Sequence, residues 1–481
     1  MDIRSGAIFF EILYPEIFVL AVGMIILLAG NFIKNKGLIA YLAIVGLIVS
    51  LVLSIQQWEQ PQSGFFGMVQ KDNATVFFNF IFIVAGIVSI LMSRSYLIAK
   101  GIEKFEYYAM ILFSTAGMMT MASSSDLVVI FLGLEIMSVP LYVLAGFARH
   151  DPSSNESGIK YFIMGAFATS FLVYGIALTY GASGTTDLRR ILADFVYLQS
   201  HAGTLIYSGA AMILIGFGFK VAAVPFHMWV PDVYQGAPTP VTAYFSVAPK
   251  AAGFAALLRI FAYGFSAMEE MTMVLWVLAF LTMTVGNVLA LLQPNIKRML
   301  AYSSIAHAGY ILVGLTAGGE GAIASILFYL LAYLFFNLGG FAIVTIIDTR
   351  TGSNAMVDEM SGLSSRHPYL AALLALFMFA LAGFPPTAGF FGKFYIFSEA
   401  VKAGFVGLTV IAVMNSFVSV YYYLRPVIKA YFGDKDLVFE PVSFKPAIVI
   451  VLIVTAIGTL GLGFFPQYAL ELSRMCMFPF M

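Results

Sequence analysis

The stretch ILIGFGFKVAAVPFHMW, residues 213–229, decides the fold, because a lysine and then a proline interrupt an apolar run of membrane-helix character. A charged side chain at the centre of a membrane helix costs about 3 kcal/mol on insertion scales. Pro225 cannot donate a hydrogen bond to the carbonyl of Val221, and its ring clashes there. The helix should therefore loosen beside Lys220. This stretch predicts a broken membrane helix that holds a buried cation.

The composition places the whole chain in lipid. Of its 481 residues, 61% are hydrophobic and only 10% are charged, whereas soluble proteins carry about 25% charged residues. Lysine plus arginine equals aspartate plus glutamate, so no basic stripe supports nucleic-acid binding. Cys476 is the single cysteine, which excludes an intrachain disulfide, an iron–sulfur cluster and a thiolate zinc site. The five histidines form no metal-spaced pair, so we expect no metal or cofactor in this chain.

A window of about 20 apolar residues predicts an all-α polytopic membrane protein with about fourteen spans. The amino terminus lacks the basic region and cleavage site of a secretory signal, so the first span is predicted to be retained. The segment 185–197 alternates charged and apolar residues, and it is either an interfacial helix or an ordinary connector. The predicted spans are 11–31, 38–56, 74–92, 106–122, 126–147, 159–181, 204–229, 238–263, 271–292, 296–317, 321–347, 369–399, 404–430 and 446–466.

The distribution of positive charge predicts the orientation. Most lysines and arginines lie in the loops that follow odd-numbered spans, as the positive-inside rule requires of the cytoplasmic side. Both termini are therefore expected on the outer side of a bacterial inner membrane. The opposite face carries only Arg4, Lys71, Arg189, Arg190, Lys402 and Arg474.

Five charged residues remain inside the predicted spans. Arg259 is close enough to a span end for its charge to reach the membrane interface, and we interpret it in that way. The other four lie deeper and together cost on the order of 10 kcal/mol, which points to a functional reason. The five are Glu135, Lys220, Lys250, Arg259 and Lys393.

The pair Glu135 and Lys220 has the chemistry of a proton switch. Burial disfavours the charged form of an amine, and an approaching carboxylate favours it. A static structural ion pair is the alternative.

A second broken helix is predicted in LAGFPPTAGFFGKFYIF, residues 381–397. Pro385 and Pro386 interrupt the span, and Lys393 follows them. Irregular backbone at membrane depth is tolerated only inside protein or beside a wet cavity. Two broken helices in two halves of a chain are typical of an ion-transport site.

Lys250 and two histidines lie between the predicted breaks. Lys250 follows Pro249 and could extend the path from Lys220. His307 is a candidate neutral relay, since imidazole accepts and donates protons near neutral pH. His227, close to the first break, is a second candidate. For both histidines, a simple hydrogen-bonded role remains the alternative.

Two longer motifs resemble a known family. VPFHMWVPDVYQGAPTPVTAYFSVAPKAAGF (224–254) and KRMLAYSSIAHAGYILVGL (297–315) resemble the proton-conducting, antiporter-like membrane subunits of respiratory complex I, NADH:quinone oxidoreductase, and among them the subunit N (chain 2) family. Related subunits occur in multisubunit sodium/proton antiporters. Matching features begin at Pro15 and Glu16, so the resemblance covers nearly the whole chain.

The resemblance implies fourteen helices, with helices 4–8 and 9–13 forming two inverted five-helix repeats in which helices 7 and 12 are broken. The implied divisions are 1–105 for helices 1–3, 106–263 for the first repeat, 271–430 for the second repeat, and 431–481 for helix 14 and the tail.

The resemblance also implies roles for the buried charges. By the family pattern, Glu135 is the charge that changes the proton affinity of Lys220. Lys250 is the lysine that connects the two halves, and Lys393 is the terminal lysine toward the outside. Asp232 and His227 match the family motif with less definite roles. Electrons would pass from NADH to quinone in partner subunits, where flavin and iron–sulfur clusters are expected, so this chain would have no redox centre. The alternatives are a subunit of a cation/proton antiporter, a related hydrogenase or another donor dehydrogenase, or a purely structural scaffold.

Overall fold

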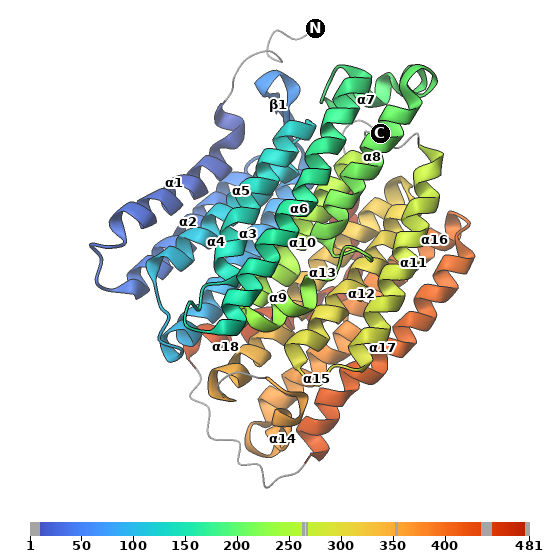
Figure 1. Cartoon of the computed structure of the whole chain (residues 1–481). Helices are drawn as coiled ribbons and strands as arrows, with labels where there is room; N and C mark the ends of the chain where they lie inside the picture. Colours follow the sequence, from blue (N-terminus) through green and yellow to red (C-terminus); the bar gives the residue numbers. More distant parts are fainter. Residues whose placement is uncertain (1–9, 262–264, 266–267, 352–354, 434–444, 477–481) are drawn as a thin grey trace.

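The computed structural model is a bundle of long helices whose axes run roughly in parallel (Figure 1). It describes residues 10–261, 265, 268–351, 355–433 and 445–476. Arg4, Lys435 and the last two residues of the predicted span 238–263 lie outside the described residues.

The first part of the chain contains three long helices and a small hairpin. The short helix η2 (Phe10–Leu13) leads into α1 (Tyr14–Ala29) and α2 (Lys36–Ile55), and the hairpin leads into α3 (Asn73–Ala99). The hairpin strands are β1 (Gln62–Gly64) and β2 (Val69–Lys71), joined by η3 (Phe65–Gly67) and paired antiparallel with Gln62 opposite Lys71.

The remaining helices complete the bundle. They are α4 (Phe105–Ala122), α5 (Leu127–Ala145), α6 (Pro152–Ser183), α7 (Leu188–Ala193), α8 (Phe195–Val221), α9 (Val230–Gly236), α10 (Thr239–Arg259), α11 (Glu269–Leu291), α12 (Ile296–Ala317), α13 (Gly319–Thr351), η5 (Val357–Met360), α14 (Leu363–Arg366), α15 (Pro368–Ala382), α16 (Ala388–Lys402), α17 (Val406–Phe432), α18 (Pro446–Phe464) and α19 (Pro466–Arg474).

The prediction of an all-α polytopic membrane protein is confirmed. Each predicted span overlaps a helix, and in the described part of the chain twelve helices are long and apolar enough to cross a membrane. Two predicted spans are not among these twelve. One corresponds to α4, and the other, 369–399, is divided between α15 and α16. The exact number of crossings stays a prediction.

The segment 185–197 proves to be partly helical. It contains the six-residue helix α7, and α8 begins two residues after α7 ends.

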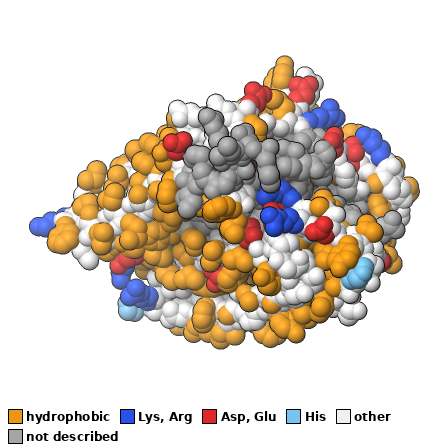
Figure 2. Space-filling view, turned by 90° about the horizontal axis from the view of Figure 1, so that it is seen from above, with side chains coloured by type: hydrophobic (Ala, Val, Ile, Leu, Met, Phe, Trp, Pro, Cys, Tyr) orange, Lys and Arg blue, Asp and Glu red, His pale blue; other side chains and the backbone are white. Residues whose placement is uncertain are grey.

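The extent to which a helix is buried depends on whether it lies in the middle of the bundle or at its edge. The central helices α10 and α12 are completely or almost completely buried, and α13 is nearly so. In the peripheral helices α1, α2, α6, α17 and α18, by contrast, most residues are partly or fully exposed. Figure 2 views the end of the bundle that carries β1 and α7; hydrophobic side chains cover much of its visible margin, and charged side chains are few and scattered. Helices α10 and α12, which have the lowest mean hydropathy of the twelve long apolar helices, thus lie in the middle of the bundle.

Glycines let two helix pairs cross in backbone contact. A Cβ at Gly117 of α4 would lie 2.3 Å from the backbone nitrogen of Met137 on α5, and one at Gly133 of α5 would lie 2.7 Å from that of Met121. The pair α11 and α12 has the same arrangement around Gly286 and Gly309. Small residues permit this close approach of membrane helices. The glycines therefore allow α5 to pack closely against α4, and α12 against α11.

The interpretation of Arg259 as an interfacial residue is wrong. Its side chain is buried and donates to both carboxylate oxygens of Asp72 at 2.9 and 3.0 Å, and to the carbonyl of Ala122 at 2.6 Å. The partners sit at the start of α3 and the end of α4, so sequence distance hides them. Arg259 thus ties the end of α10 to the first part of the chain.

Replacing Arg259 with leucine should destabilise the fold strongly, because the Asp72 carboxylate would stay buried without its guanidinium partner. The expected loss is about 3–5 kcal/mol, measured as a lower midpoint of thermal unfolding in detergent. Arg190→Leu, at an exposed position of α7, is the matched control and should change the midpoint little. Equal effects of the two substitutions would contradict this account.

Candidate functional site

Lys220 occupies the last turn of α8, in a pocket of hydroxyl and aromatic groups. Its ammonium donates to Oγ of Ser138 at 2.7 Å and to the hydroxyl of Tyr142 at 3.5 Å, both on α5. It lies 5.4 Å from the ring centroid of Tyr142 and 5.6 Å from that of Tyr161. Aromatic faces attract a desolvated cation. These groups hold Lys220 inside the bundle without a carboxylate in direct contact.

Glu135 lies one turn before Ser138 on α5 and is half-buried rather than buried. Its Oε1 accepts a hydrogen bond from Thr169 of α6 at 3.0 Å, and within the described residues it forms no ion pair with Lys220. Its neighbours Leu132, Ile136 and Val139 are exposed. The expectation of a fully buried glutamate is therefore corrected: Glu135 borders a face that is open in the isolated chain.

Both predicted breaks are observed, and the two helices end in the same way. At the end of α8, Ala222 adopts a left-handed conformation with φ of 65°, and the amide of Ala223 donates to Gly218. At the end of α15, Gly383 has φ of 92°, and the amide of Phe384 donates to Phe379. This six-to-one bond is the Schellman ending of a helix. The prolines that follow cannot resume the helix at once, which leaves irregular backbone inside the bundle.

Lys393 is directed back at the second break. Its ammonium donates to the carbonyls of Leu381 at 3.2 Å and Ala382 at 2.8 Å, and to Oγ of Ser416 on α17 at 2.9 Å. The last carbonyls of a helix have no partner within that helix, and the negative end of the helix dipole favours a cation there. The end of α15 therefore solvates Lys393. At the first break, the indole of Trp229 donates to a carbonyl in the last turn of α8, that of Phe219, at 3.1 Å.

Lys250 lies at the centre of the bundle, on the fully buried helix α10. It donates to both the carbonyl and the hydroxyl of Ser304 on α12. It does not contact Lys220 directly, but the helices are close: a Cβ on Gly253, one turn after Lys250, would lie 3.6 Å from Cβ of Lys220. The helix α10 is therefore close to Lys220 at Gly253, and its Lys250 contacts α12, the helix that carries His307.

His307 is enclosed by tyrosines. Its Nδ1 is hydrogen-bonded to the hydroxyl of Tyr329 on α13, and its Nε2 to that of Tyr423 on α17 at 2.9 Å. Tyr423 is also hydrogen-bonded to Ser303, the neighbour of the serine that accepts from Lys250. Serine and tyrosine hydroxyls both donate and accept. His307 thus belongs to a hydrogen-bonded set with Tyr329, Tyr423 and Ser303, and Ser303 is next in sequence to the serine that binds Lys250.

An asparagine continues this set toward Lys393. Nδ2 of Asn287 on α11 donates to Tyr310 at 3.0 Å, and its Oδ1 accepts from Tyr422 at 2.9 Å. The ring of Tyr310 lies 5.0 Å from the Lys393 ammonium, and Tyr422 packs against Tyr423 with ring centroids 4.4 Å apart. Lys250, His307 and Lys393 are therefore arranged around one buried polar core.

His227 does not join this arrangement. It lies in the first break, is half-buried, and its Nδ1 is buried without a partner in the described part of the molecule. The proline before it, Pro225, is exposed. The structure gives His227 no contact with the buried lysines.

Asp232 links the half-helix α9 to two long helices. Its carboxylate accepts from Lys160 of α6 and from Arg298 of α12, each at 2.6 Å. Burial opposes ionisation of Asp232, but the hydrogen bonds from Lys160 and Arg298 outweigh it and hold the pKa of this carboxyl below its ordinary value. The segment after the first break is thereby attached to the helix that carries His307.

Sequence reasoning missed several polar groups. Asp348, near the end of α13, accepts from Tyr96 at 3.0 Å and from Thr239, and Lys100 lies 3.4 Å from its Oδ1. Lys71, assigned to an outer loop, is in fact buried and paired with Glu16. Tyrosines, asparagines and serines such as Tyr423, Asn287 and Ser416 are common in membrane helices, so nothing in the sequence distinguished them. No group of three or more potential metal ligands occurs in the described ranges.

Comparison with known proteins identifies the family. The model described as "NADH:quinone oxidoreductase/Mrp antiporter, TM" matches residues 124–419. The NADH-quinone oxidoreductase subunit N of Trichlorobacter lovleyi is 46% identical to this chain, over 98% of this chain and 99% of the relative. The chain belongs to this family.

Two solved structures share the fold of this family member. A chain in respiratory complex I from Thermus thermophilus with bound aureothin is 33% identical and superposes with a TM-score of 0.80, covering 96% of this chain and 99% of its own. A chain in the Mrp complex from a Dietzia species is 21% identical with a TM-score of 0.84, covering 99% and 97% respectively. The second likeness is one of fold alone.

Asp232→Asn should lower stability in a pH-dependent way. A carboxyl whose pKa is lower in the folded than in the unfolded state stabilises the fold fully above its ordinary pKa, and this contribution is lost as the pH falls through the folded-state value. The midpoint of thermal unfolding should therefore be lower in the variant at neutral pH and should converge with that of the unaltered protein in acid. Asp358→Asn is the control, because Asp358 and Lys429 form an exposed pair. A difference that persists unchanged into acid would contradict the assignment.

Proposed function

We propose that this chain is the proton-translocating, antiporter-like membrane-arm subunit N of a bacterial NADH:quinone oxidoreductase. It passes protons along Glu135, Lys220, Lys250 and Lys393, with His307 as a relay. The observation that carries the proposal is the buried polar core around Lys250, His307 and Lys393, in which hydroxyl, imidazole and amide groups meet between two broken helices. Membership of the family supports it independently.

Lys220 acts as the switch at one end of this path. Burial disfavours its charged form, and a carboxylate that approaches favours it. Glu135 is separated from Lys220 by Ser138, which already binds the ammonium. A movement of Glu135 toward or away from Ser138 would therefore change how tightly Lys220 holds its proton. Because Glu135 borders an open face, a neighbouring membrane subunit is well placed to drive that movement.

Lys250 and His307 carry the proton across the centre. Lys250 gives its proton toward Ser304, and the adjacent Ser303 leads to Tyr423 and His307. Each hydroxyl can accept one proton while it releases another, so charge crosses without a large movement of the helices. Lys220 and Lys250 do not touch, and this gap lets the conformation control transfer between them.

Lys393 receives the proton at the second break. The carbonyls of Leu381 and Ala382 stabilise the charged amine, so a proton is held there until the local structure changes. A lysine carries a proton but repels a metal cation, which favours protons over sodium as the transported ion.

The driving reaction belongs to other subunits. We propose that flavin and iron–sulfur clusters reside in partner chains of the complex, that electrons pass from NADH to quinone there, and that this chain contributes no redox centre. Its partners are neighbouring antiporter-like and small membrane-arm subunits, in contact with the lipid bilayer. The likeness to the Mrp complex keeps a cation/proton antiporter subunit as the second candidate, distinguished by its independence of NADH.

The chain also divides into two repeats, 106–263 and 271–430, flanked by 1–105 and 431–481. Two parallels support the division. Each repeat begins with a helix pair in glycine contact, α4 with α5 and α11 with α12, and each contains a broken helix with a Schellman ending. The lysines differ: Lys220 precedes its break, and Lys393 follows its own.

Lys220→Met and Lys393→Met should each reduce NADH-driven proton pumping several-fold in the assembled complex, because a thioether cannot carry a proton. Pumping is measured in membrane vesicles as protons moved per NADH oxidised, with assembly checked on native gels. Lys402→Met, an exposed lysine on the same helix as Lys393, is the matched control and should pump normally. Unchanged pumping by both buried-lysine variants would refute the path.

Both termini are proposed to face the outer side of the membrane. A cysteine placed at either terminus should react with a membrane-impermeant maleimide added to intact spheroplasts, because the positive-inside rule places the opposite ends of the helices in the cytoplasm. A cysteine in the 148–151 loop serves as the protected control. Protection of both termini would reverse the proposed orientation.

A further inference from the structure

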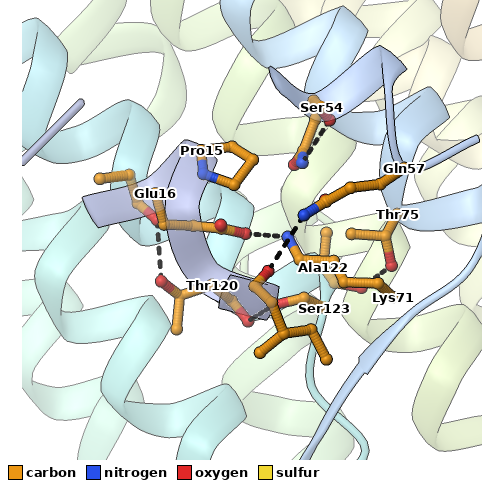
Figure 3. A network of polar contacts seen from close by, with 12 residues as sticks. Pro15, Glu16, Ser54, Gln57, Lys71, Thr75, Thr120, Ala122 and Ser123 are labelled. Carbon is orange, nitrogen blue, oxygen red and sulfur yellow. Dashed lines mark hydrogen bonds and ion pairs between the residues drawn. The ribbon is translucent and has the colours of Figure 1, made fainter. Parts of the chain in front are cut away.

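The first three long helices enclose a polar cluster that the lysine path does not use. Glu16, in the first turn of α1, and Lys71, at the end of β2, form an ion pair whose side chains are essentially inaccessible to solvent. Figure 3 shows the ends of Glu16, Lys71 and Gln57 directed toward one another. Three segments from different parts of the first hundred residues therefore meet at one buried charge pair.

The polar capacity of this cluster is only partly used. In the part of the chain that the structure describes, Oε2 of Glu16, Oε1 of Gln57 and Oδ1 of Asn79 are buried without a hydrogen-bond partner. Lys71 has three N–H donors, and Glu16 is its one acceptor among the described residues. Buried polar groups left in this state are strongly unfavourable unless water or a proton satisfies them. Buried polar groups of this kind are the usual partners of bound water.

The surrounding hydrogen bonds keep these atoms in position. Ser50 of α2 donates to the carbonyl of Pro15 at 2.9 Å, and Asn79 of α3 donates through Nδ2 to Ser54 at 3.0 Å. Gln57 uses its Nε2 on the carbonyl of Ile12, which leaves its oxygen free. The serine and amide groups thus connect α1, α2 and α3 around the ion pair, and they leave the oxygens of Gln57 and Asn79 buried without a partner among the described residues.

A second ion pair adjoins the first. Asp72 follows Lys71 directly and binds Arg259 of α10, the helix that carries Lys250. This neighbour is saturated: Arg259 also donates to Ala122 and Thr75, and Asp72 also accepts from Thr75. Cys476 is close to Asp72, and burial together with that charge raises the pKa of its thiol, so the thiol stays neutral. Of these two ion pairs, only the pair of Glu16 and Lys71 leaves a carboxylate oxygen buried without a partner among the described residues.

We propose that Glu16 and Lys71, with bound water, form a second proton site that exchanges protons with the aqueous phase at the hairpin end of the bundle. An arriving proton forms one O–H bond at Oε2 of Glu16, and it later passes to water as Glu16 returns to the carboxylate. Lys71 serves as the partner of the carboxylate, and no proton of its own is transferred in this step. The inference rests on the proposed function and assigns it a further group, outside the two repeats and outside the lysine path.

The test is Glu16→Gln in the assembled complex in membrane vesicles. Glutamine has the same shape and can still accept from Lys71, but it cannot carry a proton. We expect normal assembly on native gels, a lower number of protons moved per NADH oxidised, and partial recovery with Glu16→Asp, which restores the acid. Glu11→Gln, an exposed glutamate five residues earlier, should leave the ratio unchanged.

The double variant Glu16→Gln, Lys71→Met removes both charges and guards against misfolding caused by an unpaired lysine. A lowered proton ratio in this variant supports the proposal. An unchanged ratio in an assembled Glu16→Gln or double variant overturns it, and so does failure of every variant to assemble, which would assign the pair to packing. Lys220→Met is measured in parallel: if it lowers pumping while Glu16→Gln does not, this inference alone fails, and if neither does, the proposed function fails with it.

Discussion

An ammonium group surrounded by hydrocarbon is stable only where oxygen atoms or aromatic faces replace its water, and the rest of this structure depends on that constraint. Each of the three lysines of the central path is bound by a different set of groups. Lys220 uses a serine and two tyrosine rings, Lys250 uses a serine carbonyl and hydroxyl, and Lys393 uses the free carbonyls at the end of a helix. These ligands are neutral, so each lysine can lose its proton without leaving an unpaired carboxylate behind.

The arrangement of the helices follows from the same constraint. The helices that carry Lys250 and His307 are the least apolar of the long helices, and they lie in the middle, where other protein groups can bind their polar atoms. Helices at the edge of the bundle, among them the strongly apolar α1, α2 and α18, leave most of their surface outside the protein core. The two helix breaks supply unpaired backbone carbonyls at membrane depth, and one of them is the binding site of Lys393. Irregular backbone and buried charge therefore stabilise each other.

Buried residues that form direct ion pairs lie in a different part of the molecule from the lysines of the central path. The direct buried ion pairs, Glu16 with Lys71 and Asp72 with Arg259, are grouped around the hairpin, while no carboxylate among the described residues contacts the lysines of the central path directly. The pair of Asp72 and Arg259 fixes the ends of α3 and α10. The lysines of the central path are bound by neutral groups, and the pair of Glu16 and Lys71 leaves one buried carboxylate oxygen without a partner among the described residues.

The sequence by itself determined the membrane class, the approximate spans, both helix breaks and the three lysines of the central path, because a charge or a proline within an apolar run violates a local rule whatever its neighbours are. Only the tertiary structure determined which groups bind the buried charged residues. Lys250 meets Ser304, Lys71 meets Glu16, and Arg259 meets Asp72 across separations of 54, 55 and 187 residues. Spacing along a chain does not say which helices face each other. For that reason Arg259 looked interfacial, Glu135 looked fully buried, and the tyrosines around His307 gave no signal until the helices were packed.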